Sequence, residues 1–398
     1  MSRMLVLILL VIAQFACVSL WFAANAVMAD LVDTYHIHTS IGWLTSMVLF
    51  GFIAGTLVFA VFSISDRNSP SVVFLICAIL GAAVNAGLLI TTDHLMAIYG
   101  LRFLTGFFLA GIYPTGMKIA ADYYHKDISK ALGWLLGALV IGTAFPLLLR
   151  SGVVHLPWKL VVMTTSSMAV VGGLVIGFLV PDGPFRKSNP GFKPQVIFSI
   201  FRHPPLRKAV MGYFGHMWEL YAFWAFVPAA VFYIAKTNMI ESNTGSVMTF
   251  SFLIIAVGSI ACILGGYWAI KISSRKVALF ALISSGLCCL FSPILLQSNL
   301  LVVVPFLLFW GMTVIMDSPQ FSSMVSGYAP VENRGTALTI VNCIGFTISI
   351  ISIQLLDFLG PWMETRWIFL FLFPGPFLGV ISLLSIRSEK GESKKSIP

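Results

Sequence analysis

Three charged side chains lie deep inside long apolar runs of this 398-residue sequence: Arg102, Glu219 and Asp317. A charge near the centre of a bilayer costs several kcal/mol, so it usually faces a water-filled cavity or a partner. Arginine holds a carboxylate or phosphate with two parallel hydrogen bonds and keeps its own proton. We therefore expect Arg102 to bind an anionic group of a solute. The alternatives are that it neutralises Glu219 or serves as a structural anchor.

Glu219 is the predicted proton carrier, because removal from water favours the protonated form of a carboxylate. His216 lies one helical turn earlier, where it can share the proton or hold the carboxylate. The alternatives for Glu219 are structural pairing and direct contact with solute without a proton. Asp317 lies nearer the end of its run, so we expect it at a gate, or in a simple contact near the cytoplasmic end.

Polar and aromatic side chains three or four residues apart accompany these charges, and such residues share one face of a helix. Four such faces are predicted to enclose a wet pocket for a small polar molecule. They contain Gln14, Trp21 and Asn25; Tyr99, Arg102 and Tyr113; Tyr213, His216, Glu219 and Phe223; and Trp310, Thr313, Asp317 and Gln320.

Twelve apolar runs must position these faces, and most are about as long as the ~20 residues that cross ~30 Å of hydrocarbon. The predicted spans are 4–29, 41–63, 71–91, 95–120, 131–150, 160–181, 209–233, 246–270, 277–296, 301–324, 337–359 and 367–386. A soluble fold does not stack so many helices that are apolar all round. The sequence therefore predicts an all-α membrane protein with 12 transmembrane helices.

The composition agrees, with 58% hydrophobic and 10% charged residues. The net charge of +9 follows from topology rather than from a nucleic-acid partner. With both termini in the cytoplasm, nineteen of the 24 Lys and Arg residues fall on that side. Only Arg150, Lys159, Lys236 and Arg366 fall on the opposite side, which is a strong positive-inside bias.

No motif for catalysis or metal binding is present. The six cysteines lie within spans and lack metal-ligand spacing, and His36-x-His38 is interpreted as part of a polar loop. There is no nucleotide-binding Gly-x-x-x-x-Gly-Lys-Ser/Thr loop and no hydrolase or metalloprotease signature. We therefore expect neither an enzyme nor a cofactor, and no metal. A proton gradient is the expected energy source.

The sequence divides into two similar parts. Gly106, Pro114 and Tyr123 repeat, with the same spacing, as Gly311, Pro319 and Tyr328, and Gly51-x-Ile-Ala-x-x-Leu repeats from Gly258. The predicted organisation is an N-terminal six-helix bundle (1–181), a basic, proline-rich cytoplasmic linker (182–208), a C-terminal six-helix bundle (209–386) and a cytoplasmic tail (387–398). We expect a short amphipathic helix near 195–202. A duplicated unit of this kind places a binding site between its copies near the midplane.

In its 6+6 spans, basic central loop and internal repeat, the chain resembles the major facilitator superfamily over essentially its whole length. Asp66-Arg67 matches part of that family's loop motif after span 2, with Phe62, Ser69, Pro70 and Ser71 at its other positions. Arg102-x-x-Thr105-Gly106 resembles the Arg-x-x-Gln-Gly run of the family's proton antiporters, with Thr in place of Gln. No subfamily is identified.

The resemblance implies that spans 1, 4, 7 and 10 line a central cavity, and the three buried charges fall on spans 4, 7 and 10. It also implies that Asp66 and Arg67 pair with neighbouring helix ends and stabilise one state of a transport cycle. A turn with a solvated charge is the alternative.

The expected function is a secondary active transporter, proton-coupled, that moves a small anionic or zwitterionic organic solute by alternating access. The alternative is a proton-antiport exporter of larger amphipathic compounds. The expected partners are the solute and the lipid bilayer, with no nucleic acid, and a monomer is predicted. The expected location is a cytoplasmic (inner) membrane of bacterial type, crossed many times.

Overall fold

The chain folds into helices throughout the part that the structure describes. The structure is a computed structural model that describes residues 2–91, 94–124, 128–186, 192–239 and 243–386. No strand occurs within these ranges. The predicted tail 387–398 and linker residues 187–191 lie outside the described residues.

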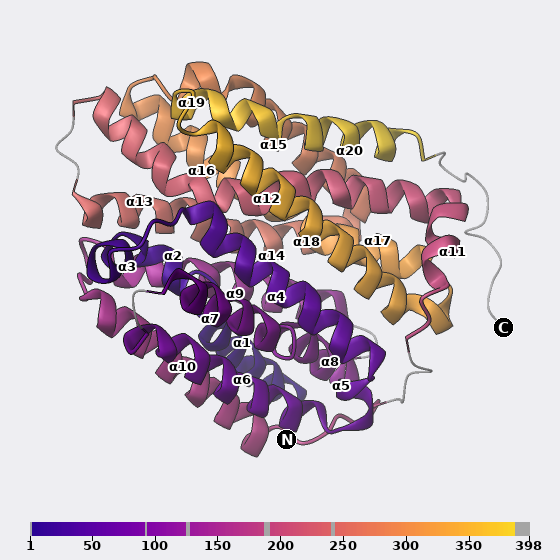
Figure 1. Cartoon of the computed structure of the whole chain (residues 1–398). Helices are drawn as coiled ribbons and strands as arrows, with labels where there is room; N and C mark the ends of the chain where they lie inside the picture. Colours follow the sequence, from indigo (N-terminus) through magenta and orange to yellow (C-terminus); the bar gives the residue numbers. More distant parts are fainter. Residues whose placement is uncertain (1, 92–93, 125–127, 187–191, 240–242, 387–398) are drawn as a thin grey trace.

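The helices form two groups that lie on either side of the molecule (Figure 1). The N-terminal group contains α1 (Arg3–Val18), α2 (Ala23–Ala26), α3 (Met28–Tyr35), α4 (Ile41–Val61), α5 (Ile64–Arg67), α6 (Pro70–Ala86), η1 (Gly87–Leu89), α7 (Leu95–Leu109), α8 (Tyr113–Tyr123), α9 (Ile128–Leu149) and α10 (Trp158–Leu179). The connecting segment contains α11 (Val196–Arg202), so the helix predicted near 195–202 is confirmed.

The C-terminal group contains α12 (Pro204–Thr237), α13 (Thr244–Ala256), α14 (Gly258–Ile272), α15 (Ser274–Leu295), α16 (Leu300–Met316), α17 (Ser318–Tyr328), η2 (Val331–Asn333), α18 (Arg334–Leu359), α19 (Thr365–Ile368), η3 (Phe369–Leu372) and α20 (Pro374–Leu384). Helix α12 begins at Pro204, inside the segment predicted as linker.

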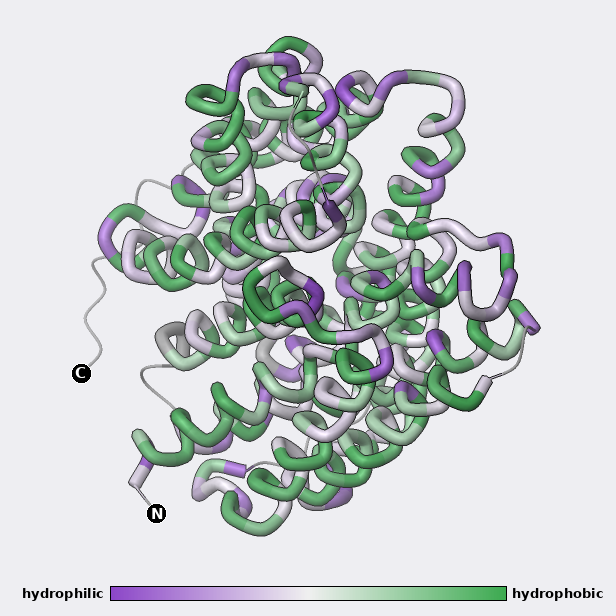
Figure 2. Tube along the Cα trace, turned by 90° about the vertical axis from the view of Figure 1, so that its left-hand side faces the viewer, coloured by the Kyte–Doolittle hydropathy of each residue, from purple (hydrophilic) through white to green (hydrophobic). Residues whose placement is uncertain are grey.

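Eleven helical segments of the described residues are long and apolar enough to cross a membrane, by length and composition. They correspond to the second to twelfth predicted spans. Figure 2 shows hydrophobic residues along the lengths of the helices and hydrophilic residues gathered in the connections. The chain is therefore an integral membrane protein that crosses the bilayer several times.

The first predicted span, 4–29, is not one continuous helix. Its regular part, α1, ends at Val18, and the backbone turns before α2 begins at Ala23. Other spans are also interrupted, among them the one in which α13 and α14 are separated at Val257. Helices α7 and α8 are separated at 110–112, and α16 and α17 at Asp317. Both of these breaks lie just before a proline, Pro114 or Pro319, because proline cannot continue the preceding hydrogen-bond ladder.

The repeated glycines stand where helices cross at backbone distance. A Cβ atom added to Gly106 of α7 would lie 1.9 Å from the Val48 carbonyl oxygen of α4. A Cβ atom added to Gly311 of α16 would lie 1.9 Å from the Ile254 carbonyl oxygen of α13. The two groups of helices thus contain the same glycine-dependent crossing at matching positions of the sequence repeat.

Hydrogen bonds join the two groups at one end of the molecule. We call the end where α3 and α13 lie the distal end (Figure 1). Ser40, which precedes α4, donates its hydroxyl hydrogen to the Asp357 carboxylate near the end of α18, with an oxygen–oxygen distance of 2.6 Å. The Gly152 N–H donates to the Gly245 carbonyl oxygen at 2.9 Å. Further along α4, the Gln354 amide donates to the Ser46 hydroxyl at 2.9 Å. The distal end is therefore joined by polar contacts between the groups.

We predict that Gly106→Ala destabilises the protein, because the new methyl group forces α4 and α7 apart. Overpacking of this kind costs about 1–3 kcal/mol. Gly100→Ala, in the same helix, is the matched control, since a Cβ atom there meets nothing within 4 Å. Thermal unfolding of the purified variants in detergent measures the difference. Equal unfolding temperatures for the two variants would contradict the close crossing.

Candidate functional site

Arg102 lies in the N-terminal group and is completely buried. Its guanidinium donates hydrogen bonds to the carbonyl oxygens of Leu20 and Trp21. These carbonyls lie in the turn after α1, where no continuing helix supplies the main-chain N–H groups that would donate to them in the usual i to i+4 pattern. Arg102 therefore supplies donors to two carbonyls where the first predicted span is interrupted. Its Nε atom has no hydrogen-bond partner among the described residues.

Glu219 is buried in the C-terminal group, on the face of α12 that packs against α15 and α16. Its carboxylate accepts from the Trp310 indole N–H at 2.7 Å, the Ser285 hydroxyl at 2.8 Å and the Cys289 thiol at 3.3 Å. No ion pair joins this carboxylate to a cation within the part of the chain that the structure describes. Glu219 and Arg102 thus have separate partners, and no ion pair between them is found among the described residues.

His216 pairs with Asp317 rather than with Glu219. The His216 Nδ1 atom lies 2.8 Å from an Asp317 carboxylate oxygen, and both side chains are buried. The rings of Tyr213 and Phe321 both pack near the imidazole, each with a centroid distance of 5.9 Å, and lie 6.1 Å from each other. Asp317 occupies the junction between α16 and α17. Two residues predicted to have different roles, proton coupling and gating, therefore form one buried pair.

The other predicted site residues of the N-terminal group are dispersed. Gln14 packs beside Gly116 of α8, and its amide atoms lack partners among the described residues. The Asn25 amide donates to the Thr45 hydroxyl at 2.7 Å. Tyr99 shares a hydrogen bond with Thr39 at 3.0 Å and stacks on Trp43, toward the distal end. Tyr113 begins α8 and is partly buried against the main apolar core.

The corresponding residues of the C-terminal group lie closer together. The Phe223 ring packs on Trp310 with a centroid distance of 4.6 Å, beside Glu219. The Thr313 hydroxyl donates to main-chain carbonyls of its own helix. Gln320 is buried near Gly265 of α14, and its amide nitrogen has no partner among the described residues. The structure thus brings Tyr213, His216 and Asp317 together, and separately Glu219, Phe223 and Trp310.

Asp66 and Arg67, which match part of the loop motif after the second span, have different surroundings. Asp66 forms an ion pair with Lys118 of α8, and its carbonyl oxygen accepts from Arg186 at 3.3 Å. Arg186 also donates to the carbonyl oxygen of Asn68 at 2.7 Å. Arg67 is exposed. Asp66 therefore connects the segment after α4 to the middle of α8.

Five aromatic residues meet where the two groups of helices face each other. Trp21 and Phe52 come from the N-terminal group, and Tyr221, Trp224 and Phe346 come from the C-terminal group. We call them the central aromatic cluster. Trp21 stacks on Tyr221 at a centroid distance of 5.7 Å, and Phe52 packs on Phe346 at 4.8 Å. Tyr221 also contacts Trp224 at 5.5 Å and Phe346 at 5.3 Å.

Only Trp21 of this cluster was among the predicted site residues. Phe52, Tyr221 and Phe346 lie close to the midpoints of α4, α12 and α18. A search for aromatic residues at span centres would have found them. The predicted site residues of α12 instead share a face with the polar residue Glu219. Tyr221 lies on the opposite face, about 200° around the helix from Glu219 at ~100° per residue.

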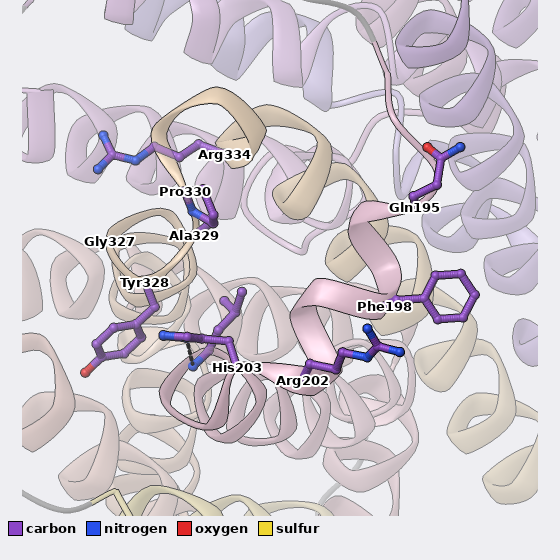
Figure 3. Close-up of a pocket in the computed structure, with 10 residues that line it drawn as sticks. Gln195, Phe198, Arg202, His203, Gly327, Tyr328, Ala329, Pro330 and Arg334 are labelled. Carbon is purple, nitrogen blue, oxygen red and sulfur yellow. Dashed lines mark hydrogen bonds between the residues drawn. The ribbon is translucent and has the colours of Figure 1, made fainter.

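A cavity of about 1030 Å³ opens beside α11. Figure 3 shows it between α11 and the turn that joins α17 to α18. The residues that line it are Gln195, Phe198, Arg202, His203, Leu206, Gly327, Tyr328, Ala329, Pro330 and Arg334. None of them belongs to the predicted pocket, so this cavity belongs to the surface of the linker and the C-terminal group.

Comparison with protein families gives a match to the Major Facilitator Superfamily, over residues 10–353 and, in an overlapping match, 213–398. A search of curated proteins gives no match. The family match covers most of the chain and both groups of helices.

We predict that Arg102→Met destabilises the protein more than Arg102→Lys. Methionine leaves the Leu20 and Trp21 carbonyls buried without donors, at a cost of about 1–3 kcal/mol for each unsatisfied group. The lysine ammonium keeps a donor for at least one of them. Arg67→Met, at an exposed arginine, controls for loss of charge alone. Thermal unfolding would contradict this role of Arg102 if both variants at residue 102 matched the wild type.

Proposed function

Since the chain belongs to the major facilitator superfamily and is therefore a membrane transporter, we propose that it is a proton-coupled secondary active transporter. It moves a small polar organic solute, anionic or zwitterionic, across the membrane by alternating access. The proposed location is a bacterial-type cytoplasmic membrane, where the protein acts as a monomer. The fold supports this proposal through its many membrane-spanning helices and its repeated glycine crossing.

The proposed architecture is two six-helix bundles, 1–181 and 209–386, with a linker at 182–208 and both termini in the cytoplasm. The excess of Lys and Arg around the termini and the linker supports this orientation. In this orientation the distal end faces outward. The Ser40–Asp357 and Gly152–Gly245 hydrogen bonds then join the bundles on the outer side. The conformation described here corresponds to a transporter closed toward the outside.

The observation that carries proton coupling is the Glu219 carboxylate, buried among three donors and without a cation in ion-pair contact among the described residues. Carboxylates held inside a membrane bundle in this way are typical of proton relays. The His216–Asp317 pair lies on the same side of α12 and is a second group able to exchange a proton. We propose that the transport cycle loads and unloads Glu219, with His216 as the neighbouring proton acceptor.

Arg102 is the proposed contact for an anionic solute group. Its Nε atom has no hydrogen-bond partner in the part of the chain that the structure describes, and a carboxylate could replace the carbonyl oxygens that the guanidinium now contacts. The central aromatic cluster favours the second candidate function, export of larger amphipathic compounds by proton antiport. Such compounds carry apolar surface that aromatic rings bind well. The two candidates differ in the solute, which is a small polar anion or zwitterion in the first and a larger amphipathic compound in the second.

We predict that Glu219→Gln abolishes solute accumulation driven by a pH gradient, while solute exchange in the absence of a gradient persists. Glutamine keeps the shape and the hydrogen-bond acceptor but does not carry the proton. Proteoliposomes loaded with solute measure both activities. Wild-type accumulation in the Glu219→Gln variant would exclude Glu219 as the coupling residue. Asp317→Asn, tested in parallel, reports whether the His216 pair carries the proton instead.

We also predict that joining the two groups of helices at the distal end stops transport. Ser40→Cys combined with Asp357→Cys creates a pair that an oxidant or a short thiol crosslinker links. Transport should fall at least tenfold on crosslinking and return on reduction. Ser69→Cys with Asp182→Cys is the matched control, because these side chains also lie 2.6 Å apart but within the N-terminal region. Undiminished transport with the distal pair fully crosslinked would contradict opening at that end.

A further inference from the structure

The central aromatic cluster lies where a transporter of this architecture must change contacts during its cycle. Its members come from both groups of helices, and three of them lie at the midpoints of long spanning helices. At ~1.5 Å per residue, the middle of such a helix lies near the middle of the bilayer. The cluster therefore lies near the midplane, where the two groups of helices meet.

Two indole N–H groups of this cluster have no acceptor among the described residues. The Nε1 atoms of Trp21 and Trp224 are buried and lack hydrogen-bond partners among the described residues. A buried tryptophan normally finds an acceptor for its N–H group. Trp310 and Trp218, outside the cluster, do so: they donate to Glu219 at 2.7 Å and to the Phe371 carbonyl oxygen at 3.0 Å. The two unpaired donors thus distinguish the cluster from ordinary packing.

The charges around the cluster favour an anion over a cation. Arg102 donates to the main-chain carbonyl of Trp21, so its positive charge lies next to that residue. The two buried acidic residues of the C-terminal group have other partners. The Glu219 carboxylate accepts hydrogen bonds from Trp310, Ser285 and Cys289. Asp317 pairs with His216. Aromatic side chains that bind a cation usually have an acidic side chain nearby. The central aromatic cluster contains no acidic side chain, so it does not have this feature of a cation site.

We propose that the transported solute is a planar aromatic carboxylate or a closely similar aromatic organic anion. Its ring takes the place of the contact between Trp21 and Tyr221, and its carboxylate accepts hydrogen bonds from the indole N–H groups of Trp21 and Trp224. This proposal rests on the proposed transport function and specifies the solute of that site. It assigns the site to residues of both groups, so solute contacts both of them at once.

The experiment measures binding and transport of a small set of probes by the purified full-length protein. The probes are benzoate and indole-3-acetate as aromatic anions, acetate and cyclohexanecarboxylate as non-aromatic anions, and benzyltrimethylammonium as an aromatic cation. Thermal shift and equilibrium dialysis report binding in detergent, and counterflow in proteoliposomes reports transport. We expect the aromatic anions to bind at least tenfold more tightly than the other probes.

Trp21→Phe and Trp224→Phe test the donors, because phenylalanine keeps an aromatic ring and removes the N–H group. Each variant should weaken binding of the aromatic anions about tenfold, the effect of one lost hydrogen bond to a charged group. Trp268→Phe, at a half-exposed tryptophan outside the cluster, is the control and should bind as the wild type does. Unchanged affinity in both cluster variants would overturn the proposal. So would equal binding of benzoate and cyclohexanecarboxylate, or preference for the cation.

The outcomes separate this proposal from the proposed function. If aromatic anions bind through the two tryptophans but are not transported, the site is correct and the transport assignment for these solutes is wrong. If a non-aromatic solute is transported with proton coupling while the aromatic anions do not bind, the transporter stands and the solute class is overturned.

Discussion

Close contact between helix backbones is the constraint on which the rest of this structure depends. In lipid, burial of apolar side chains does not draw helices together, so association relies on packing and on hydrogen bonds. Gly106 against Val48 and Gly311 against Ile254 allow the backbones of crossing helices to touch. The same helices carry the chemistry: α7 carries Arg102, and α16 carries Trp310. Their side chains are therefore positioned by crossings that admit no larger residue than glycine.

The buried charges are divided between the two groups of helices. The cation, Arg102, compensates main-chain carbonyls in the N-terminal group, and the acids Glu219 and Asp317 have donors or an imidazole in the C-terminal group. Each group can thus be stable without an ion pair from the other, as the proposed alternating access requires. In that mechanism, an Arg102–Glu219 pair between the groups would have to be broken in every cycle, at a cost of several kcal/mol.

The sequence predicts the helices and the repeat well, because span length and glycine spacing are direct consequences of bilayer thickness and backbone contact. It does not predict the surroundings of the charges. Polarity indicates that Glu219 must avoid lipid, but it does not indicate whether the residue faces a cavity or a neighbouring helix of its own group. The acceptors of Arg102 are main-chain carbonyls, and these depend on where α1 ends at Val18. The central aromatic cluster was missed because Phe52, Tyr221 and Phe346 carry no charge that marks them within apolar runs.

Trp21 connects the parts of this arrangement. Its carbonyl oxygen accepts from Arg102, and its ring stacks on Tyr221 of the other group of helices. The interruption of the first span frees that carbonyl, so the break, the arginine and the ring stack form one connected set of contacts. A solute carboxylate that draws the Arg102 guanidinium away would leave the Trp21 carbonyl without a donor and favour a new position of its ring. Binding of an anion would then alter the aromatic contact between the two groups directly, without a signal carried through distant residues.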